Sequence, residues 1–90
     1  MAIRFTARQM SGGSGHQHIA QLAWIEDGTT ETKVSTRSEL VDFVNRGGQG
    51  YVRDATGRQA WVRVVNATPP YLQTYADNVP TDNLLTLPLF

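Results

Sequence analysis

Apolar and polar side chains alternate along the first part of the chain. A strand is predicted from Ile3 to Gln9, because this period of two is typical of a strand that buries one face. The apolar face carries Ile3, Phe5 and Ala7, and the polar face carries Arg4, Thr6 and Arg8. A second strand is predicted from about His18 to Glu26. Asp27-Gly28 follows it, a dipeptide typical of two-residue hairpin loops. The more polar stretch from Thr29 to Ser35 then predicts a strand at an exposed edge.

One helix is predicted from Thr36 onward. Thr36 and Glu39 have the spacing of a capping box, in which the threonine hydroxyl accepts from a free backbone N–H and the glutamate reaches back to the cap. Gly47 and Gly48 end the helix. A helix this short needs a sheet to pack on. Its apolar stripe, at helical spacing, consists of Leu40, Val41, Phe43 and Val44.

A second hairpin is predicted downstream of the helix, with strands from Gly50 to Asp54 and from Arg58 to Asn66. A three-residue loop, Ala55 to Gly57, places Tyr51 opposite Trp61. One face of the hairpin is apolar and is predicted to belong to the core: Val52, Ala60, Val62 and Val64. The other face mixes aromatic, basic and aliphatic side chains: Tyr51, Arg53, Trp61, Arg63 and Val65.

The last part of the chain predicts a short strand, a turn and an apolar tail. The strand, Tyr71 to Tyr75, follows two prolines, and the stretch from Ala76 to Asn83 has the composition of a turn. The elements together predict a single α+β domain over residues 1–90. It has a mostly antiparallel sheet of about five strands, one helix packed on one face, and the apolar C-terminal tail.

Composition narrows the classes of function. The 90 residues are enough for one domain and include no cysteine, which excludes disulfides and thiolate zinc sites. No apolar run has the length of a membrane span, so we expect a cytoplasmic protein without a membrane partner. Eight basic and eight acidic residues give a net charge of zero. This balance argues against general nucleic-acid binding, which needs a basic field.

Four stretches of the chain resemble one known family. They are the glycine-rich segment that runs into HQHIAQLAW, the helix RSELVDFVNRG, the strand AWVRVVNA and the ending YLQTYADNVPTDNLLTLP. Together they are similar to a small bacterial and phage family catalogued as domain of unknown function 3892. Gln73 stands where that family usually has arginine. The resemblance covers nearly the whole chain and implies a single domain, and it brings no established activity or catalytic residue.

The mixed face of the second hairpin is the best candidate for a ligand site. The rings of Tyr51 and Trp61 can stack on a planar ligand, and the guanidinium groups of Arg53 and Arg63 can hold an anion. The competing interpretation is that the apolar tail covers this face, because large exposed apolar patches are unusual on monomers. We expect the tail to be ordered, extended and packed on this face of its own sheet or of a neighbour's. Its anchors are Asn83, Leu84, Leu85 and Leu87.

The chain contains two histidines, His16 and His18. On an extended chain, residues two apart point to the same side, so both could contact one ligand or one metal ion. A metal site needs a third ligand, and the distant Asp77 and Asp82 are the candidates for it. We therefore predict no metal site and no cofactor.

These features favour a small, non-catalytic binding module that forms a homo-oligomer and binds a partner protein or a small anionic ligand. A nucleotide signal used in host defence, sequestered by a phage protein, is one ligand of this kind. Two alternatives stay open. The first is a structural or adaptor protein without a small ligand, and the second is a metal-dependent hydrolase that uses His16 and His18.

Overall fold

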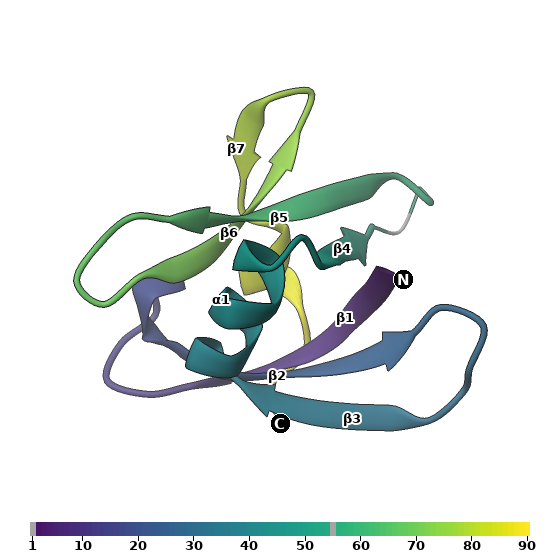
Figure 1. The fold of residues 1–90 in the computed structure, drawn as a ribbon, viewed down its shortest axis with the longest axis horizontal. Coiled ribbons are helices and arrows are strands. Elements are labelled where there is room, and N and C mark those ends of the chain that lie inside the picture. The colour runs from purple at the N-terminus through teal and green to yellow at the C-terminus, as the bar shows by residue number, and fades with distance from the viewer. Residues whose placement is uncertain (1, 55) are drawn as a thin grey trace.

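The computed structural model describes residues 2–54 and 56–90. Within them, the chain forms seven strands, one α-helix and two short 3-10 helices, and Figure 1 shows how they are arranged. The order of the elements is β1 (Ala2–Met10), η1 (His16–His18), β2 (Ile19–Glu26), β3 (Thr32–Thr36), α1 (Arg37–Asn45), β4 (Gln49–Arg53), β5 (Gln59–Val65), β6 (Tyr71–Ala76), β7 (Val79–Thr81) and η2 (Asn83–Thr86), where η denotes a 3-10 helix.

All seven strands belong to one sheet, in the order β3-β2-β1-β4-β5-β6-β7. Every neighbouring pair is antiparallel except β1 and β4, which are parallel. The predicted α+β class is therefore confirmed, but the sheet is mixed and has seven strands where the sequence predicted about five. The strand that the sequence did not predict is β7.

The parallel pair joins the two halves of the sheet. After β3, the chain passes through α1 and returns beside the first strand, where Ile3 lies opposite Gly50. A Cβ atom at Gly50 would come within 2.5 Å of the Phe5 ring. Glycine at this position thus lets the ring of Phe5 lie against the backbone of β4, where it fills the centre of the core.

The helix begins with the predicted capping box. The Thr36 N–H donates to the Glu39 carboxylate at 2.9 Å, and the Glu39 N–H donates to the Thr36 hydroxyl at 3.3 Å. Leu40 and Val41 are buried, and the helix packs on the sheet as its apolar stripe requires. The core that results combines residues of the sheet, the helix and the tail: Ile3, Phe5, Ile19, Leu22, Leu40, Val41, Val52, Val62, Leu72 and Leu84.

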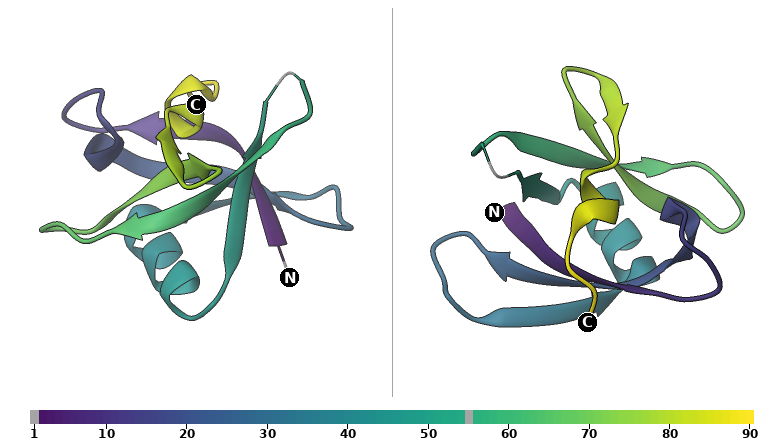
Figure 2. Two further views of the ribbon diagram at one scale, coloured as in Figure 1. Left: turned by 90° about the horizontal axis from the view of Figure 1, so that it is seen from above. Right: turned by 180° about the vertical axis from the view of Figure 1, so that it is seen from behind.

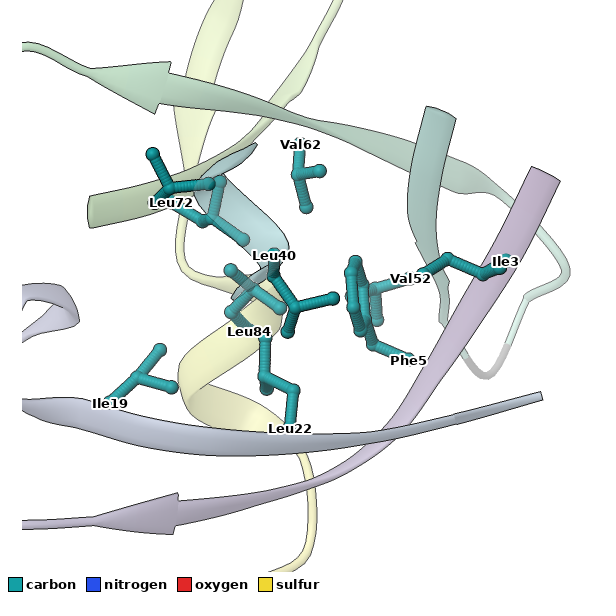
Figure 3. Packing of buried hydrophobic residues seen from close by; sticks show 10 residues of the cluster. Ile3, Phe5, Ile19, Leu22, Leu40, Val52, Val62, Leu72 and Leu84 are labelled. Carbon is teal, nitrogen blue, oxygen red and sulfur yellow. The ribbon is translucent and has the colours of Figure 1, made fainter. Parts of the chain in front are cut away.

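The sheet is strongly curved, so that β1 and β2 lie on one side of the core and β5 and β6 on the other (Figure 1). The helix fills the space between these two wings from one side, and the C-terminal segment with η2 fills it from the opposite side (Figure 2). Figure 3 shows Leu84 of the tail among Leu40, Leu22 and Leu72. The tail is therefore a structural part of the domain.

The first hairpin differs from its prediction. Asp27-Gly28 forms a turn, with the Thr29 N–H donating to Glu26 O at 3.0 Å and Gly28 at a φ of 88°. Strand pairing starts only at Thr32, opposite Ile25, so the loop is longer than two residues. The reason is that Asp27 is drawn toward β1, because its N–H donates to Ala2 O at 3.0 Å. The predicted position of β3 at the edge of the sheet is confirmed.

The second hairpin has the predicted register. Tyr51 pairs with Trp61 and Val52 with Ala60, as a three-residue loop requires. Ala55, one residue of that loop, lies outside the described residues. Asp54 organises the rest of the loop, because its carboxylate accepts from the N–H groups of Thr56 at 2.9 Å and Arg58 at 3.0 Å.

A strand that the sequence did not predict closes the sheet. The stretch from Ala76 to Asn83 was interpreted as a turn, but Val79–Thr81 pairs with β6. Asp77 and Asn78 form the connection, with φ angles of 52° and 63°. Asp and Asn tolerate this left-handed region better than other residues that carry a Cβ atom, which permits the tight loop. The new hairpin places the chain so that η2 enters the core.

A buried pair of hydroxyls fixes this hairpin. Thr74 is completely buried, and its hydroxyl donates to Thr81 O at 3.1 Å. The Thr81 hydroxyl in turn donates to Thr74 Oγ1 at 2.7 Å. Because a buried hydroxyl without a partner costs free energy, these two bonds favour one position of β7 and hence one path into the tail.

In the part of the chain that the structure describes, no helix combines the length and the apolar character needed to cross a membrane.

Candidate functional site

Four side chains form a row across the face of the sheet that points away from the core. The strand register pairs Arg4 with Tyr51, Tyr51 with Trp61, and Trp61 with Tyr75. These residues come from β1, β4, β5 and β6, which are consecutive in the sheet. We call Arg4, Tyr51, Trp61 and Tyr75 the ring row, and it spans three strand spacings of about 4.8 Å, roughly 14 Å.

The centre of the ring row is an aromatic pair. The ring centroids of Tyr51 and Trp61 are 5.0 Å apart, with a tilt of 48° between the planes. Tyr51 is only 3% exposed, whereas Trp61 is 39% exposed. The more exposed ring thus rests on the more buried one and offers a surface to solvent. Aromatic pairs at this separation are favourable beyond their buried area.

A hydrogen bond fixes the position of Tyr51. Its hydroxyl donates to Oδ1 of Asp27 at 2.7 Å, which connects β4 to the turn between β2 and β3. This bond raises the pKa of Tyr51, and burial and the negative charge of Asp27 act in the same direction. The positive charges of Arg53 and Arg4 partly oppose the rise, so both guanidinium groups lie close enough to act on the phenol.

Two further arginines lie over rings of the row. The guanidinium carbon of Arg53 is 5.9 Å from the centre of the Tyr51 ring, and that of Arg63 is 4.6 Å from the centre of the Tyr75 ring. Both distances are within the range of cation–π attraction. Arg63 also donates to the side-chain oxygen of Asn78, which holds it beside Tyr75. The two outer rings of the row, Tyr51 and Tyr75, are therefore each flanked by a positive charge.

Two hollows open along the ring row, and Gln59 borders both. The first, the arginine hollow, has a volume of about 360 Å³ and is lined by Arg4, Tyr51 and Arg53 together with the acidic residues Glu26 and Asp27. The second, the tryptophan hollow, has a volume of about 400 Å³, and its lining includes Trp61, Tyr75, Arg58 and Asp77. Their shared border makes them two parts of one surface.

The tail does not lie on the aromatic residues of this face. Leu84 has no exposed surface and belongs to the core, and Leu85 and Leu87 pack against the same core. The expectation that Tyr51, Trp61 and Val65 form the surface under the tail is therefore wrong. The physical reason is that the curved sheet leaves an apolar opening opposite the helix, which the leucines fill.

The conformation of the tail also differs from the expected extended chain. Asn83–Thr86 is a 3-10 helix, and the Asn83 carbonyl accepts from the Thr86 hydroxyl at 2.8 Å. Beyond it the chain is extended and adds to β1: the Arg8 N–H donates to Pro88 O at 2.8 Å, and the Phe90 N–H donates to Arg8 O at 3.0 Å. The tail thus pairs with the part of β1 that has moved away from β4.

The two histidines lie apart from the ring row and do not form an extended pair. Both belong to η1, and residues two apart in a 3-10 helix point to different sides. Burial lowers the pKa of His16, and the negative charge of Asp82 opposes this effect. His18 instead lies over Gly13, whose Cβ position would be 2.5 Å from its ring. Among residues 2–54 and 56–90, no three His, Asp or Glu side chains come together as a metal site would require.

A larger hollow lies elsewhere, at the end of α1. Its volume is about 530 Å³, and Phe43, Arg46 and the acidic residues Glu39 and Asp42 border it. Glu39 belongs to the capping box, so part of this lining already has a structural role. The ring row joins several charged groups to exposed aromatic surface, and we therefore place the candidate site there.

The sequence identified part of the ring row and missed the rest. Tyr51, Arg53, Trp61 and Arg63 were expected on one face, and the register places them there. Arg4 and Tyr75 were not expected to join them, because their positions depend on the pairing of β1 with β4, which are distant in sequence, and on the pairing of β5 with β6. For Tyr75 a signal existed: the alternation of β6 buries Leu72 and Thr74 and so turns Tyr75 outward.

The comparisons with known proteins give one match. The model of a family described as Protein of unknown function (DUF3892) matches residues 1–88. No curated protein and no solved structure matches the chain.

Proposed function

We propose that this chain, which belongs to the DUF3892 family, is a small non-catalytic binding module whose ligand site is the ring row. The ligand combines a planar ring with a negatively charged group, and a nucleotide is the ligand class with both features. We also propose that the protein acts in the cytoplasm as a homo-oligomer, in which a second subunit can border the exposed edge of Trp61.

The observation that supports this proposal is the row of Arg4, Tyr51, Trp61 and Tyr75 across four neighbouring strands. Trp61 keeps 39% of its surface in solvent although a tryptophan gains free energy when it is buried. Stacking of a base on an exposed aromatic side chain contributes about 1–3 kcal/mol. The flat ring supported by Tyr51 is thus suited to a planar ligand.

The charges around the row favour a small anion over a polymer. Arg53 and Arg63 lie on either side of the aromatic pair, but acidic residues accompany them, and the net charge of the chain is zero. Binding to the backbone of a nucleic acid depends on several phosphate contacts at once, and it needs an excess of basic residues. One anionic group near one or two arginines requires no such excess.

Geometry gives less support to the two other functions. The hydrolase alternative requires His16 and His18 to act together, but η1 turns them to different sides. For an adaptor protein, the exposed end of the tail is the relevant feature: Leu89 is 66% and Phe90 48% exposed. These two residues would serve a protein partner, and the ring row would then remain free.

A ligand screen of the purified protein tests the proposal. Thermal-shift measurements and native mass spectrometry with a panel of nucleotides, nucleosides and inorganic phosphate should identify at least one nucleotide that raises the melting temperature and remains bound in the gas phase. Linkage requires that a ligand that binds the folded state alone stabilises it. If no member of the panel shifts the melting temperature or adds mass, the nucleotide proposal is wrong.

A further inference from the structure

The two hollows of the ring row differ in their chemistry. The arginine hollow is bordered almost entirely by polar groups, among them two guanidinium groups. The tryptophan hollow combines ring surface from Trp61 and Tyr75 with the polar residues Arg58, Gln59 and Asp77. A ligand that fills both hollows therefore has one charged end and one planar end, and the shared border at Gln59 fixes where the two ends join.

The arginine hollow is suited to a single phosphate. Arg4 and Arg53 both line this hollow, and the guanidinium carbon of Arg53 is 5.9 Å from the centre of the Tyr51 ring, so their charges act on the same small volume. Guanidinium groups bind phosphate through paired hydrogen bonds. Glu26 and Asp27 border the same hollow, and they balance the two positive charges. These carboxylates repel any phosphate, and the repulsion grows with the charge of the ligand, so a chain of three phosphates is disfavoured more than one phosphate.

The tryptophan hollow is suited to a base with an exocyclic amino group. Asp77 and Gln59 border it together with Trp61. A carboxylate accepts hydrogen bonds and does not donate them. It therefore favours a base edge that carries an amino group over an edge that carries a carbonyl oxygen in the same place.

We infer that the ligand is a nucleoside monophosphate with an amino-bearing base, held with its phosphate between Arg4 and Arg53 and its base on Trp61, and that Asp77 selects the base. This inference rests on the proposed function and adds the orientation and the chemical class of the ligand. The ring row predicts stacking of a planar group, and the two hollows predict which end of the ligand lies where.

Isothermal titration calorimetry with four probes tests the inference. The probes are adenosine monophosphate, inosine monophosphate, adenosine and adenosine triphosphate. The first two differ by an amino group against a carbonyl oxygen, and the others differ from the first in their phosphates. We expect adenosine monophosphate to bind about tenfold more tightly than inosine monophosphate and than adenosine, because each comparison removes a hydrogen bond to a charged group. The triphosphate should bind no more tightly than the monophosphate.

Two variants separate the ends of the site. Asp77→Asn removes the carboxylate and preserves the fold, because asparagine accepts the φ of 52° at this position. It should abolish the preference for adenosine monophosphate over inosine monophosphate and leave the preference over adenosine. Arg53→Gln should do the reverse, and Arg53 is exposed, so this change spares the core. Arg46→Gln, at the end of α1, is the matched control for loss of one guanidinium and should change neither preference.

The outcomes distinguish the inference from the proposed function. If a probe binds and Trp61→Ala abolishes its binding, but the two monophosphates bind equally, the assignment of Asp77 is overturned while the binding face stands. Tighter binding of the triphosphate than of the monophosphate overturns the single-phosphate hollow in the same way. If none of the four probes binds while another nucleotide of the screen does, the inference fails and the proposed function stands. If binding survives Trp61→Ala unchanged, the proposed function fails and the inference fails with it.

Discussion

The hydroxyl of Tyr51 donates a hydrogen bond to Oδ1 of Asp27 across 2.7 Å. This bond joins the central strand β4 to the turn after β2, two segments that are separated by 24 residues along the chain. It fixes the phenol ring of Tyr51, whose centroid is 5.0 Å from that of the Trp61 ring. The position of the ring row therefore depends on a turn that is not part of the row.

The Tyr51–Asp27 bond predicts the titration of Tyr51. The bond, burial and the charge of Asp27 raise the pKa of Tyr51 above its usual value of 10.0. The raised pKa stabilises the fold below the unfolded-state pKa of about 10, and this contribution is lost as the pH rises through the folded-state pKa. Ultraviolet titration of the folded protein should show one tyrosine that ionises above 10.0, and Asp27→Ala should lower its midpoint. Asp42→Ala, on the exposed side of α1, should leave the midpoint unchanged; an unchanged midpoint in Asp27→Ala would contradict the bond.

The capping box of α1 predicts a loss of stability in Thr36→Ala. The Thr36 hydroxyl accepts from the Glu39 N–H at 3.3 Å, and loss of such a cap costs about 1 kcal/mol. Urea unfolding should show this change, and Thr32→Ala on the exposed edge strand should change stability by less than about 0.5 kcal/mol. Equal midpoints for wild type and Thr36→Ala would show that the cap does not stabilise the helix.

The same box predicts how stability depends on pH. Hydrogen bonds from the Thr36 backbone and hydroxyl lower the pKa of Glu39 below its usual value of 4.5. Since the folded-state pKa is depressed, this contribution is present above pH 4.5 and is lost as the pH falls through the lowered pKa. An NMR titration should give a Glu39 pKa below 4.5 in the wild type and a higher value in Thr36→Ala. A Glu39 pKa that is the same in both proteins would exclude this coupling.

Local signals in the sequence predicted the elements whose contacts are local. Thr36 and Glu39 are three residues apart, so their pairing follows from helix geometry alone. The register of Tyr51 against Trp61 follows from the length of one loop. The burial of Leu84 followed from its apolar surroundings in the chain, although the surface that covers it did not.

Features that depend on distant pairing or on short segments could not be predicted in the same way. The β1–β4 pair brings Arg4 beside Tyr51 across a large separation in sequence, and no local pattern encodes it. The strand β7 has three residues with a proline in the middle, which is too short for a period and contains a residue that is rare in strands. The signal for its hairpin was Asp77-Asn78, two neighbouring residues that tolerate positive φ.

The burial of the tail predicts that its removal destabilises the domain. Deletion of residues 83–90 uncovers the core around Leu84 and removes the pairing with Arg8. The free energy of unfolding should therefore fall by several kcal/mol, which thermal unfolding would show as a lower melting temperature, or the protein should change its oligomeric state. Leu84→Ala should cost about 2–5 kcal/mol, because the side chain has no exposed surface. Leu89→Ala, 66% exposed, is the matched control and should cost less than about 0.5 kcal/mol. A truncated protein that keeps both its melting temperature and its mass in light scattering would show that the tail is not part of the core.

The geometry of η1 predicts weak binding of zinc. His16 and His18 point to different sides of a 3-10 turn, so a single ion cannot use both without local unfolding. Calorimetric titration with zinc at neutral pH should show no sub-micromolar site. A sub-micromolar site that either His16→Ala or His18→Ala abolishes would contradict this arrangement and would favour the hydrolase.

The central claim is that the exposed ring of Trp61 binds the ligand, and one pair of variants tests it most directly. Trp61→Ala removes the stacking surface, and Val34→Ala, on the edge strand β3, removes another exposed apolar side chain that is 51% exposed. The measurement is the dissociation constant of the tightest nucleotide from the screen, determined by calorimetry for the wild type and both variants. We predict that Trp61→Ala weakens binding at least tenfold, as the loss of about 1–3 kcal/mol of stacking implies, and that Val34→Ala leaves it unchanged. Equal affinities for the wild type and Trp61→Ala would contradict the assignment of the ring row as the ligand site.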